Sequence, residues 1–322
     1  MDRPRQLSHP GWCDNLIRAG RLHAGERVLV VVDEPLVEEG AQLATAVWDA
    51  GGKPRLELWA GERPLPAPPA PVREAARSAD LCLILVQEPR GDEAGARIAL
   101  GETVTGRGGR ALLLGFVDGE LLRGELSQPA PDLSGRARRL LAQLEGARTV
   151  RVRGPAGTDL VLRVDGRPWL TDALPLEPRQ IANFPGGEVY VAPLAGGADG
   201  VLVADLTVPY TVEGLLDRPV ALRFERGRVT SIEGGEAARR LHELVQRAGP
   251  GADVIAELGI GLNPAVAPRG HVMLDEKAAG TAHVAIGSNT GPYGGDNEAA
   301  IHVDCVFTLA GVEADGRAVE LP

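Results

Sequence analysis

Carboxylate and imidazole side chains gather in three stretches of the second half of this 322-residue sequence. Glu188 follows a Pro-Gly-Gly turn in NFPGGEVY, and Glu257 ends the apolar run VIA before a glycine-rich bend. His283 lies in the strand-like run TAHVAIG, while His302 and Asp304 alternate with apolar residues in IHVDCVF. Because side chains alternate between the two faces of a strand, His302 and Asp304 share one face. Oxygen and nitrogen donors that a fold brings together in this way are typical ligands of a metal ion.

Each of these side chains also has a simpler interpretation, because a single histidine is more commonly a satisfied core or surface residue. His302 and Asp304 are costly to bury unpaired, so they either pair with each other or bind a further group. The prediction of a metal site therefore depends on the whole set. A set of His, Asp and Glu without cysteine favours Zn, Co, Mn or Fe over a thiolate site.

Composition limits the class of protein. The length predicts two domains, and 44% hydrophobic residues are enough for two cores. A net charge of −10 disfavours nucleic acid and anionic membranes as partners. No apolar run approaches the ~20 residues of a membrane helix, and the N-terminus lacks the apolar region of a secretory signal, so we expect a cytoplasmic protein.

The elements that must position the site residues divide near residue 147. Residues 1–147 alternate strand and helix signals, which predicts an α/β, Rossmann-like domain with a mostly parallel sheet. Residues 148–322 carry short alternating strands, a hairpin and one clear helix, which predicts an α+β metal-binding domain rich in antiparallel sheet. The expected strands are 26–32, 54–59, 80–86 and 110–116, and the expected helices are 36–52, 71–79, 135–146 and 235–249.

The site segments resemble those of the M29 metallopeptidases, the aminopeptidase T family, and in particular its shorter members. NFPGGEVYVAP is similar to that family's Asn-x-Pro-x-Gly-Glu-Val segment, and ELGIGLNP is similar to its second glutamate segment. HVAIG followed by HVD is similar to its histidine segments, in the same order along the chain. The resemblance covers the second domain well and the first only in its general α/β character.

This resemblance implies a metallo-aminopeptidase that uses water activated by two divalent ions, Zn, Co or Mn, to release N-terminal residues from peptides. It implies a small peptide or amino-acid-derived substrate and a homodimer. Glu188 would be both a catalytic residue and a ligand, and the complete ligand set would be Glu188, Glu257, His283, His302 and Asp304.

The sequence departs from the family pattern in the loop 287–300, GSNTGPYGGDNEAA. Thr290 stands where the family has its catalytic tyrosine, and Tyr293 is the candidate to replace it through a shifted loop or only shapes the turn. The same loop offers Asn289, Asp296 and Asn297 to bind a substrate, or is a plain connection between two strands.

Two other functions remain open. Ring-cleaving dioxygenases that act on dihydroxypyridines resemble distant members of this fold, and His283, His302 and Asp304 are a possible facial triad for one Fe(II). Because the chain keeps both glutamates, we expect the hydrolase rather than the dioxygenase. The third possibility is a non-catalytic binding or biosynthetic accessory protein. Glu276 and Lys277 are a candidate ion pair near the site.

Overall fold

The computed structural model describes residues 9–87, 93–115, 117–128 and 131–321. The chain divides into two compact units, and it passes between them more than once. The first unit comprises Met1–Asp132 and Asp172–Gly186, and the second comprises Leu133–Thr171 and Gly187–Pro322. Within the described part of the chain, no helix is long and apolar enough to cross a bilayer.

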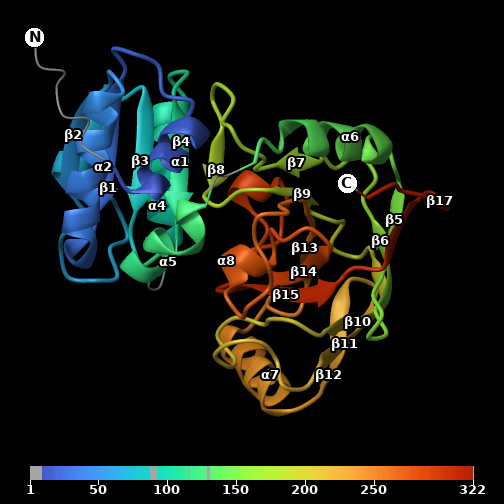
Figure 1. Ribbon diagram of the computed structural model, residues 1–322. Helices are drawn as coiled ribbons and strands as arrows, with labels where there is room; N and C mark the ends of the chain where they lie inside the picture. Colours follow the sequence, from blue (N-terminus) through green and yellow to red (C-terminus); the bar gives the residue numbers. More distant parts are fainter. Residues whose placement is uncertain (1–8, 88–92, 116, 129–130, 322) are drawn as a thin grey trace, which may run out of the picture. The chain divides into compact units, whose positions relative to one another are not determined.

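The first unit is built on a parallel five-stranded sheet, which confirms the α/β prediction (Figure 1). The strand order is β2-β1-β3-β4-β8, so the direction of winding reverses between β1 and β3, as in doubly wound folds. The fifth strand comes from the segment that returns from the second unit. The strands are β1 (Arg27–Val32), β2 (Lys53–Leu58), β3 (Leu81–Leu85), β4 (Arg110–Leu114) and β8 (Ile181–Asn183).

Helices cover both faces of this sheet. Leu29, Val31 and Ile84 face a buried cluster that includes Val72 and Leu100 from the helices of one side, while Gly40 from the other side packs against Val32. The strands read as nearly continuous apolar runs because both faces are covered. The helices are α1 (Gly11–Ala19), α2 (Val37–Asp49), α3 (Ala70–Ala76), α4 (Glu93–Thr105) and α5 (Gly119–Arg123), with 3₁₀ turns at η1 (Glu34–Leu36) and η2 (Glu125–Ser127).

The second unit contains two antiparallel sheets, again as predicted. The seven-stranded sheet has the order β12-β11-β10-β6-β5-β16-β17 and includes the predicted hairpin, β5 paired with β6. Its strands are β5 (Thr149–Arg153), β6 (Asp159–Arg163), β10 (Ala198–Ala204), β11 (Val220–Glu225), β12 (Arg228–Glu233), β16 (Gly311–Ala314) and β17 (Arg317–Ala318).

The five-stranded sheet of this unit has the order β15-β14-β13-β9-β7. Its strands are β7 (Leu170–Thr171), β9 (Glu188–Val191), β13 (Ile255–Gly261), β14 (Thr281–Gly287) and β15 (His302–Thr308). The remaining elements are α6 (Ser134–Leu144), α7 (Glu236–Ala248), α8 (Val272–Asp275) and the 3₁₀ turn η3 (Gly291–Tyr293).

The predicted elements largely agree with the structure. The four strands expected in the first half correspond to β1 to β4, with ends that differ by one or two residues; residue 116, the end of the last, lies outside the described residues. The predicted helices correspond to α2, α3, α6 and α7. The helices α1 and α4 and the return of β8 to the parallel sheet are not among the elements predicted from the sequence.

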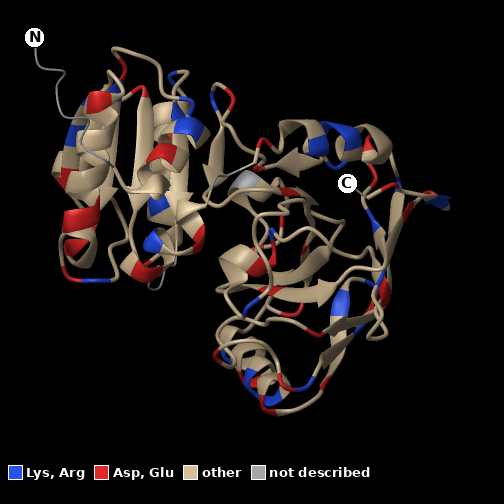
Figure 2. Ribbon diagram, in the orientation of Figure 1, with Lys and Arg blue, Asp and Glu red and all other residues tan. Residues whose placement is uncertain are grey.

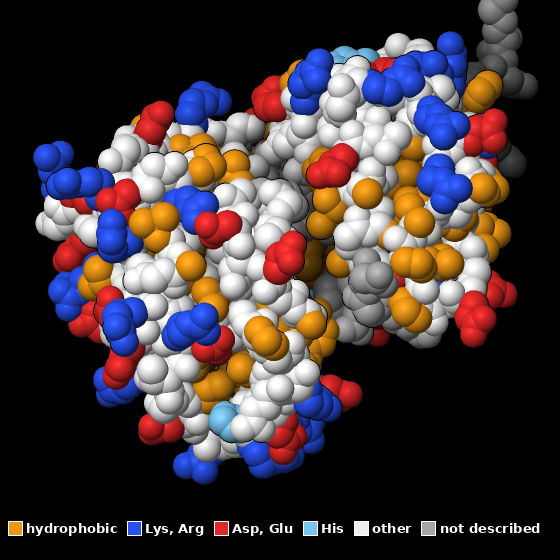
Figure 3. All heavy atoms as spheres, turned by 180° about the vertical axis from the view of Figure 1, so that it is seen from behind, with side chains coloured by type: hydrophobic (Ala, Val, Ile, Leu, Met, Phe, Trp, Pro, Cys, Tyr) orange, Lys and Arg blue, Asp and Glu red, His pale blue; other side chains and the backbone are white. Residues whose placement is uncertain are grey.

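Charged side chains of both signs are interspersed along the ribbons of both units (Figure 2). The face in Figure 3 likewise mixes acidic and basic side chains with small apolar areas. The helix α6 carries three basic residues, Arg136, Arg138 and Arg139, and its ribbon is partly blue in Figure 2.

Candidate metal centre

One face of the five-stranded antiparallel sheet carries all five predicted ligands. Residues that face each other in neighbouring strands lie on the same side of a sheet, so the strand register places them together. Asp304 of β15 and Glu257 of β13 both pair with Ala285 of β14, one from each side. The other pairs on this face are His302 with Gly287, His283 with Gly259, and Glu188 with Gly261.

Small residues separate the ligands on this face and leave room for their side chains. A Cβ added to Gly259 would lie 2.0 Å from Cε1 of His283, so the imidazole occupies the space that a side chain there would need. The expectation that Glu257 ends its strand is wrong, since β13 continues through Gly259 and Gly261. Glycine, which usually weakens a strand, is accepted here because the imidazole packs against its backbone.

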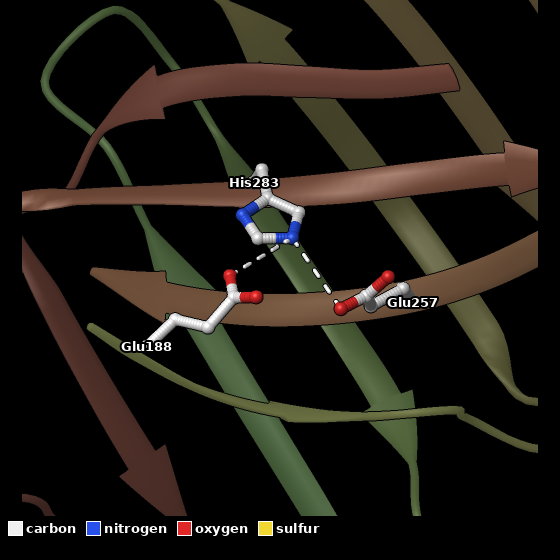
Figure 4. Close-up of side chains that lie close together, drawn as sticks. All are labelled: Glu188, Glu257 and His283. Atoms are coloured by element: carbon white, nitrogen blue, oxygen red, sulfur yellow. Dashed lines mark ion pairs between the residues drawn. The ribbon is translucent and has the colours of Figure 1, made fainter. Parts of the chain in front are cut away.

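His283 points its ring into a group of carboxylates. Nε2 lies 3.7 Å from Oε2 of Glu188, 3.6 Å from Oε1 of Glu257 and 3.8 Å from Oδ1 of Asp304. Figure 4 shows the ring between the first two of these carboxylates. All three separations are too long for a good hydrogen bond. The ring nitrogen therefore lies among three carboxylates without a close hydrogen bond to any of the three.

His302 is oriented by a backbone carbonyl. Its Nδ1 donates to the carbonyl oxygen of Ser288 at 2.7 Å, and its Nε2 lies 3.2 Å from both Oε2 of Glu257 and Oδ1 of Asp304. In a metal-binding histidine, one ring N–H typically donates to a carbonyl or carboxylate, which fixes the tautomer and leaves the other ring nitrogen, here Nε2, to bind the metal. The carbonyl of Ser288 has that role here.

The electrostatics of this group favour positive charge. Burial opposes charge on the imidazole of His283, yet the neighbouring Glu257, Glu188 and Asp304 together raise its pKa to about 10. The pKa of His302 is also raised despite burial, chiefly by Asp304, and the nearby His302 lowers the pKa of Asp304. Carboxylates that stabilise a proton on each imidazole would equally stabilise a metal cation in its place.

Lys277 and Glu276 belong to the same group, and their ion pair is present. Nζ of Lys277 lies 3.0 Å from Oε1 of Glu276 and makes a closer contact with Oε1 of Glu188. Burial raises the pKa of Glu276 to about 7, although Lys277 acts in the opposite direction. Both residues follow α8, which is anchored where Asp275 accepts from the backbone of Gly270 at 2.8 Å.

The ring of Tyr293 lies at the site, three residues after Thr290, the position where a tyrosine was expected. The ring of Tyr293 stacks on His302, with centroids 4.7 Å apart and 19° between the planes. Tyr190 contacts the same tyrosine edge-on at 6.1 Å. Burial raises the pKa of the Tyr293 phenol well above its usual value, so the hydroxyl keeps its proton. The two tyrosines form an aromatic wall beside His302.

The three predicted substrate-binding residues have different surroundings. Asn289 is fully buried; its Nδ2 donates to the carbonyl of Ala256 at 3.2 Å and its Oδ1 accepts from the amide of Asn297 at 2.9 Å. The side chain of Asn297 donates to the carbonyls of Gly251 and Gly287. Asp296 is exposed and pairs with Arg167 at 3.2 Å. These bonds hold the loop 287–300, and substrate contact by the three residues stays a prediction.

The donor set fits a divalent cation. Among the described residues there are three groups of possible ligands, and within each group the ligand atoms lie within 4.8 Å of one another. Some residues belong to two of the groups. Two ligands each about 2.1 Å from one ion would lie roughly 3.0–3.4 Å apart, close to the separations around His302. The groups are Glu188 with Glu257 and His283, Glu257 with His302 and Asp304, and Glu276 with His283 and Asp304.

Comparison with known proteins gives two kinds of match. The sequence matches the family of NicX, 2,5-dihydroxypyridine 5,6-dioxygenase, over residues 71–320. The fold is similar to that of 2,5-dihydroxypyridine dioxygenase from Pseudomonas putida KT2440, with a TM-score of 0.79, 19% identity and coverage of 97% of this chain and 96% of the other.

The fold is also similar to AmpT from Thermus thermophilus, with a TM-score of 0.62, 19% identity and coverage of 96% of this chain and 98% of the other. No curated protein matches the sequence. The expected resemblance to the aminopeptidase T family therefore holds for the fold, and the similarity to the dioxygenase structure is greater.

These matches overturn the expected metallo-aminopeptidase. The family match is to a ring-cleaving dioxygenase, so a peptide hydrolase with a metal-activated water is the wrong interpretation of this site. The preference for a hydrolase depended on the presence of both Glu188 and Glu257. Those motifs position carboxylates on a scaffold that the two functions share, and Glu188 is bound to Lys277.

Proposed function

Because the chain belongs to the family of NicX, 2,5-dihydroxypyridine 5,6-dioxygenase, we propose that it opens a dihydroxylated pyridine ring with molecular oxygen at a single Fe(II). The observation that carries this proposal is the convergence of two histidines on one carboxylate. Oδ1 of Asp304 lies 3.2 Å from Nε2 of His302 and 3.8 Å from Nε2 of His283. Two histidines and a carboxylate form the facial triad typical of non-haem Fe(II) oxygenases.

Fe(II) held by His283, His302 and Asp304 would supply the redox chemistry for the reaction with oxygen. The remaining work falls to the protein. Ser288 fixes the imidazole of His302 through its carbonyl, and Ala285 leaves space between Glu257 and Asp304. Glu257 and His283, which are 2% and 1% exposed, close one side of the centre to water, whereas His302 and Asp304 are only partly buried.

The aromatic wall suits a flat heteroaromatic substrate. Tyr293 and Tyr190 present ring faces and edges beside His302. Aromatic pairs of this geometry contribute about 0.5–1.5 kcal/mol beyond the area they bury. Glu188 and His302 both point into the group, which also supports a working centre over a non-catalytic accessory protein, because a disused site has no need of buried carboxylates.

The test is oxygen consumption by protein loaded anaerobically with Fe(II) and then given 2,5-dihydroxypyridine. We expect one O₂ consumed per ring opened, and mass spectrometry with ¹⁸O₂ should find both oxygen atoms in the ring-opened product. The Zn(II)-loaded protein is the control, because Zn(II) has no redox chemistry, and it should consume no oxygen. Fe(II)-loaded protein that leaves dihydroxypyridines and O₂ unchanged would contradict the proposal.

A further inference from the structure

Lys277 is a lysine in an unusual place. It is 1% exposed, it is one of only two lysines in the chain, and its Nζ contacts carboxylates of the metal centre, Glu188 and Glu276. Taking an ammonium out of water costs several kcal/mol in proteins, and close carboxylate partners offset that cost. The position of Lys277 therefore depends on a local excess of negative charge.

That excess is visible in the formal charges. The group holds four carboxylates, those of Glu188, Glu257, Glu276 and Asp304, and one ammonium, which leaves −3 when all four carboxylates are ionised and both histidines are neutral. One divalent ion reduces the excess to −1. A second divalent ion beside Lys277 would reverse the sign, whereas it would bring the group to neutrality if the ammonium were absent.

The overlap of the possible ligand groups points to the place where the ammonium acts. Two of the three groups contain either Glu188 or Glu276, and both of these carboxylates contact Lys277. The third group, Glu257 with His302 and Asp304, contains neither of them. A second ion would thus need a carboxylate that already has the ammonium as its partner.

We propose that the ammonium of Lys277 takes the place of a second metal ion and limits the centre to one. It binds Glu188 and Glu276, repels a further cation, and leaves the single ion to the group that contains neither of them, Glu257 with His302 and Asp304. His283 lies beside that group, with Nε2 3.8 Å from Oδ1 of Asp304. This inference rests on the proposed Fe(II) centre, since it explains how a scaffold with enough carboxylates for two ions is restricted to one.

The experiment counts metal ions, with Zn(II) and Co(II) as probes, by mass spectrometric metal analysis of dialysed protein and by titration. The wild-type protein should bind one ion per chain. Lys277→Met, which keeps the length and removes the charge, should bind two. Lys277→Arg should bind one, because the charge remains. The double variant Lys277→Met with Glu188→Gln should return to one, because the second ion would lose its carboxylate.

Either of two results would overturn the proposal: two tightly bound ions in the wild-type protein, or one ion in folded Lys277→Met. If Lys277→Met does not fold, Glu188→Gln decides. This variant should still bind one ion, because Glu188 serves Lys277 and not the metal, and loss of the ion would refute the assignment. One bound ion without oxygen consumption would contradict only the proposed dioxygenase, whereas oxygen consumption with two ions bound would contradict only the role of Lys277.

Discussion

Gly259 determines the space available to the imidazole of His283. A methyl group at this position would overlap Cε1 of the ring at 2.0 Å and Nε2 at 2.4 Å. The ring is buried, and its strand, β14, is paired with β13 on one side and with β15 on the other. The ring therefore has little freedom to move away. A residue without a side chain is therefore part of the metal centre.

We expect Gly259→Ala to weaken Zn(II) binding by about 10–100-fold, the size of effect seen when ligand-orienting residues are changed. The displaced Nε2 would no longer face the carboxylates. Isothermal titration measures the loss. Gly311→Ala is the matched control, because it is also a strand glycine and a Cβ there meets nothing within 4 Å. Unchanged affinity in Gly259→Ala would show that His283 is not a ligand.

At the scale of elements, the loop 287–300 joins two ligand-bearing strands and is held from within. Asn289 bonds the carbonyl of Ala256 and the amide of Asn297, and Asn297 bonds the carbonyls of Gly251 and Gly287. The 3₁₀ turn η3 lies inside this loop and places Tyr293 on His302. The buried side chain of Asn289 thus supports the loop that carries Tyr293.

Asn289→Ala should lower the free energy of unfolding by about 1–3 kcal/mol, because it leaves buried partners unsatisfied. Because the loop positions the aromatic wall, the fold-increase in KM for the ring substrate should exceed the fold-loss of metal affinity. Denaturant unfolding and steady-state oxygen consumption measure the two effects. Asp296→Ala, in the same loop but 75% exposed, should change stability by less than about 0.5 kcal/mol. Equal effects of the two variants would argue against an internal support.

Sequence alone could predict the ligand-bearing strands because their pattern is local. Alternation in IHVDCVF places His302 and Asp304 on one face, and the structure has that arrangement. The same alternation in the two neighbouring strands places a small residue two positions after a ligand: Gly259 follows Glu257, and Ala285 follows His283. The strand return of β8 was beyond prediction, because three residues carry too little periodicity to indicate which sheet they join.

The chemistry was harder to predict than the place. Glu188 and Glu257 have the types and order of a two-metal site, and that pattern led to the wrong enzyme class. What distinguishes the two cases is the partner of each carboxylate. The contact of Lys277 with Glu188 joins residues 89 positions apart, so no motif could reveal it.

At the scale of the whole molecule, we expect the proposed metal ion to contribute to folding, because it would bind the folded state and not the unfolded one. The folded state brings the possible ligand atoms of each group within 4.8 Å of one another, and the unfolded chain does not hold them together. We expect removal of the metal by a chelator to lower the free energy of unfolding by about 4 kcal/mol, relative to protein with free metal at ~1,000 times Kd. Calorimetry with and without chelator measures the difference. His302→Ala should show no such dependence, and wild-type protein insensitive to the chelator would contradict a bound ion.

The first unit receives its last strand late. In the sheet, β8 lies next to β4. In the sequence, β5, β6 and β7 of the second unit come between them. Until residues 181–183 are made, a sheet formed by β1 to β4 would leave the edge of β4 without its partner strand. Open edges invite mispairing. Because β5 and β6 pair with each other, they leave the edge of β4 to β8.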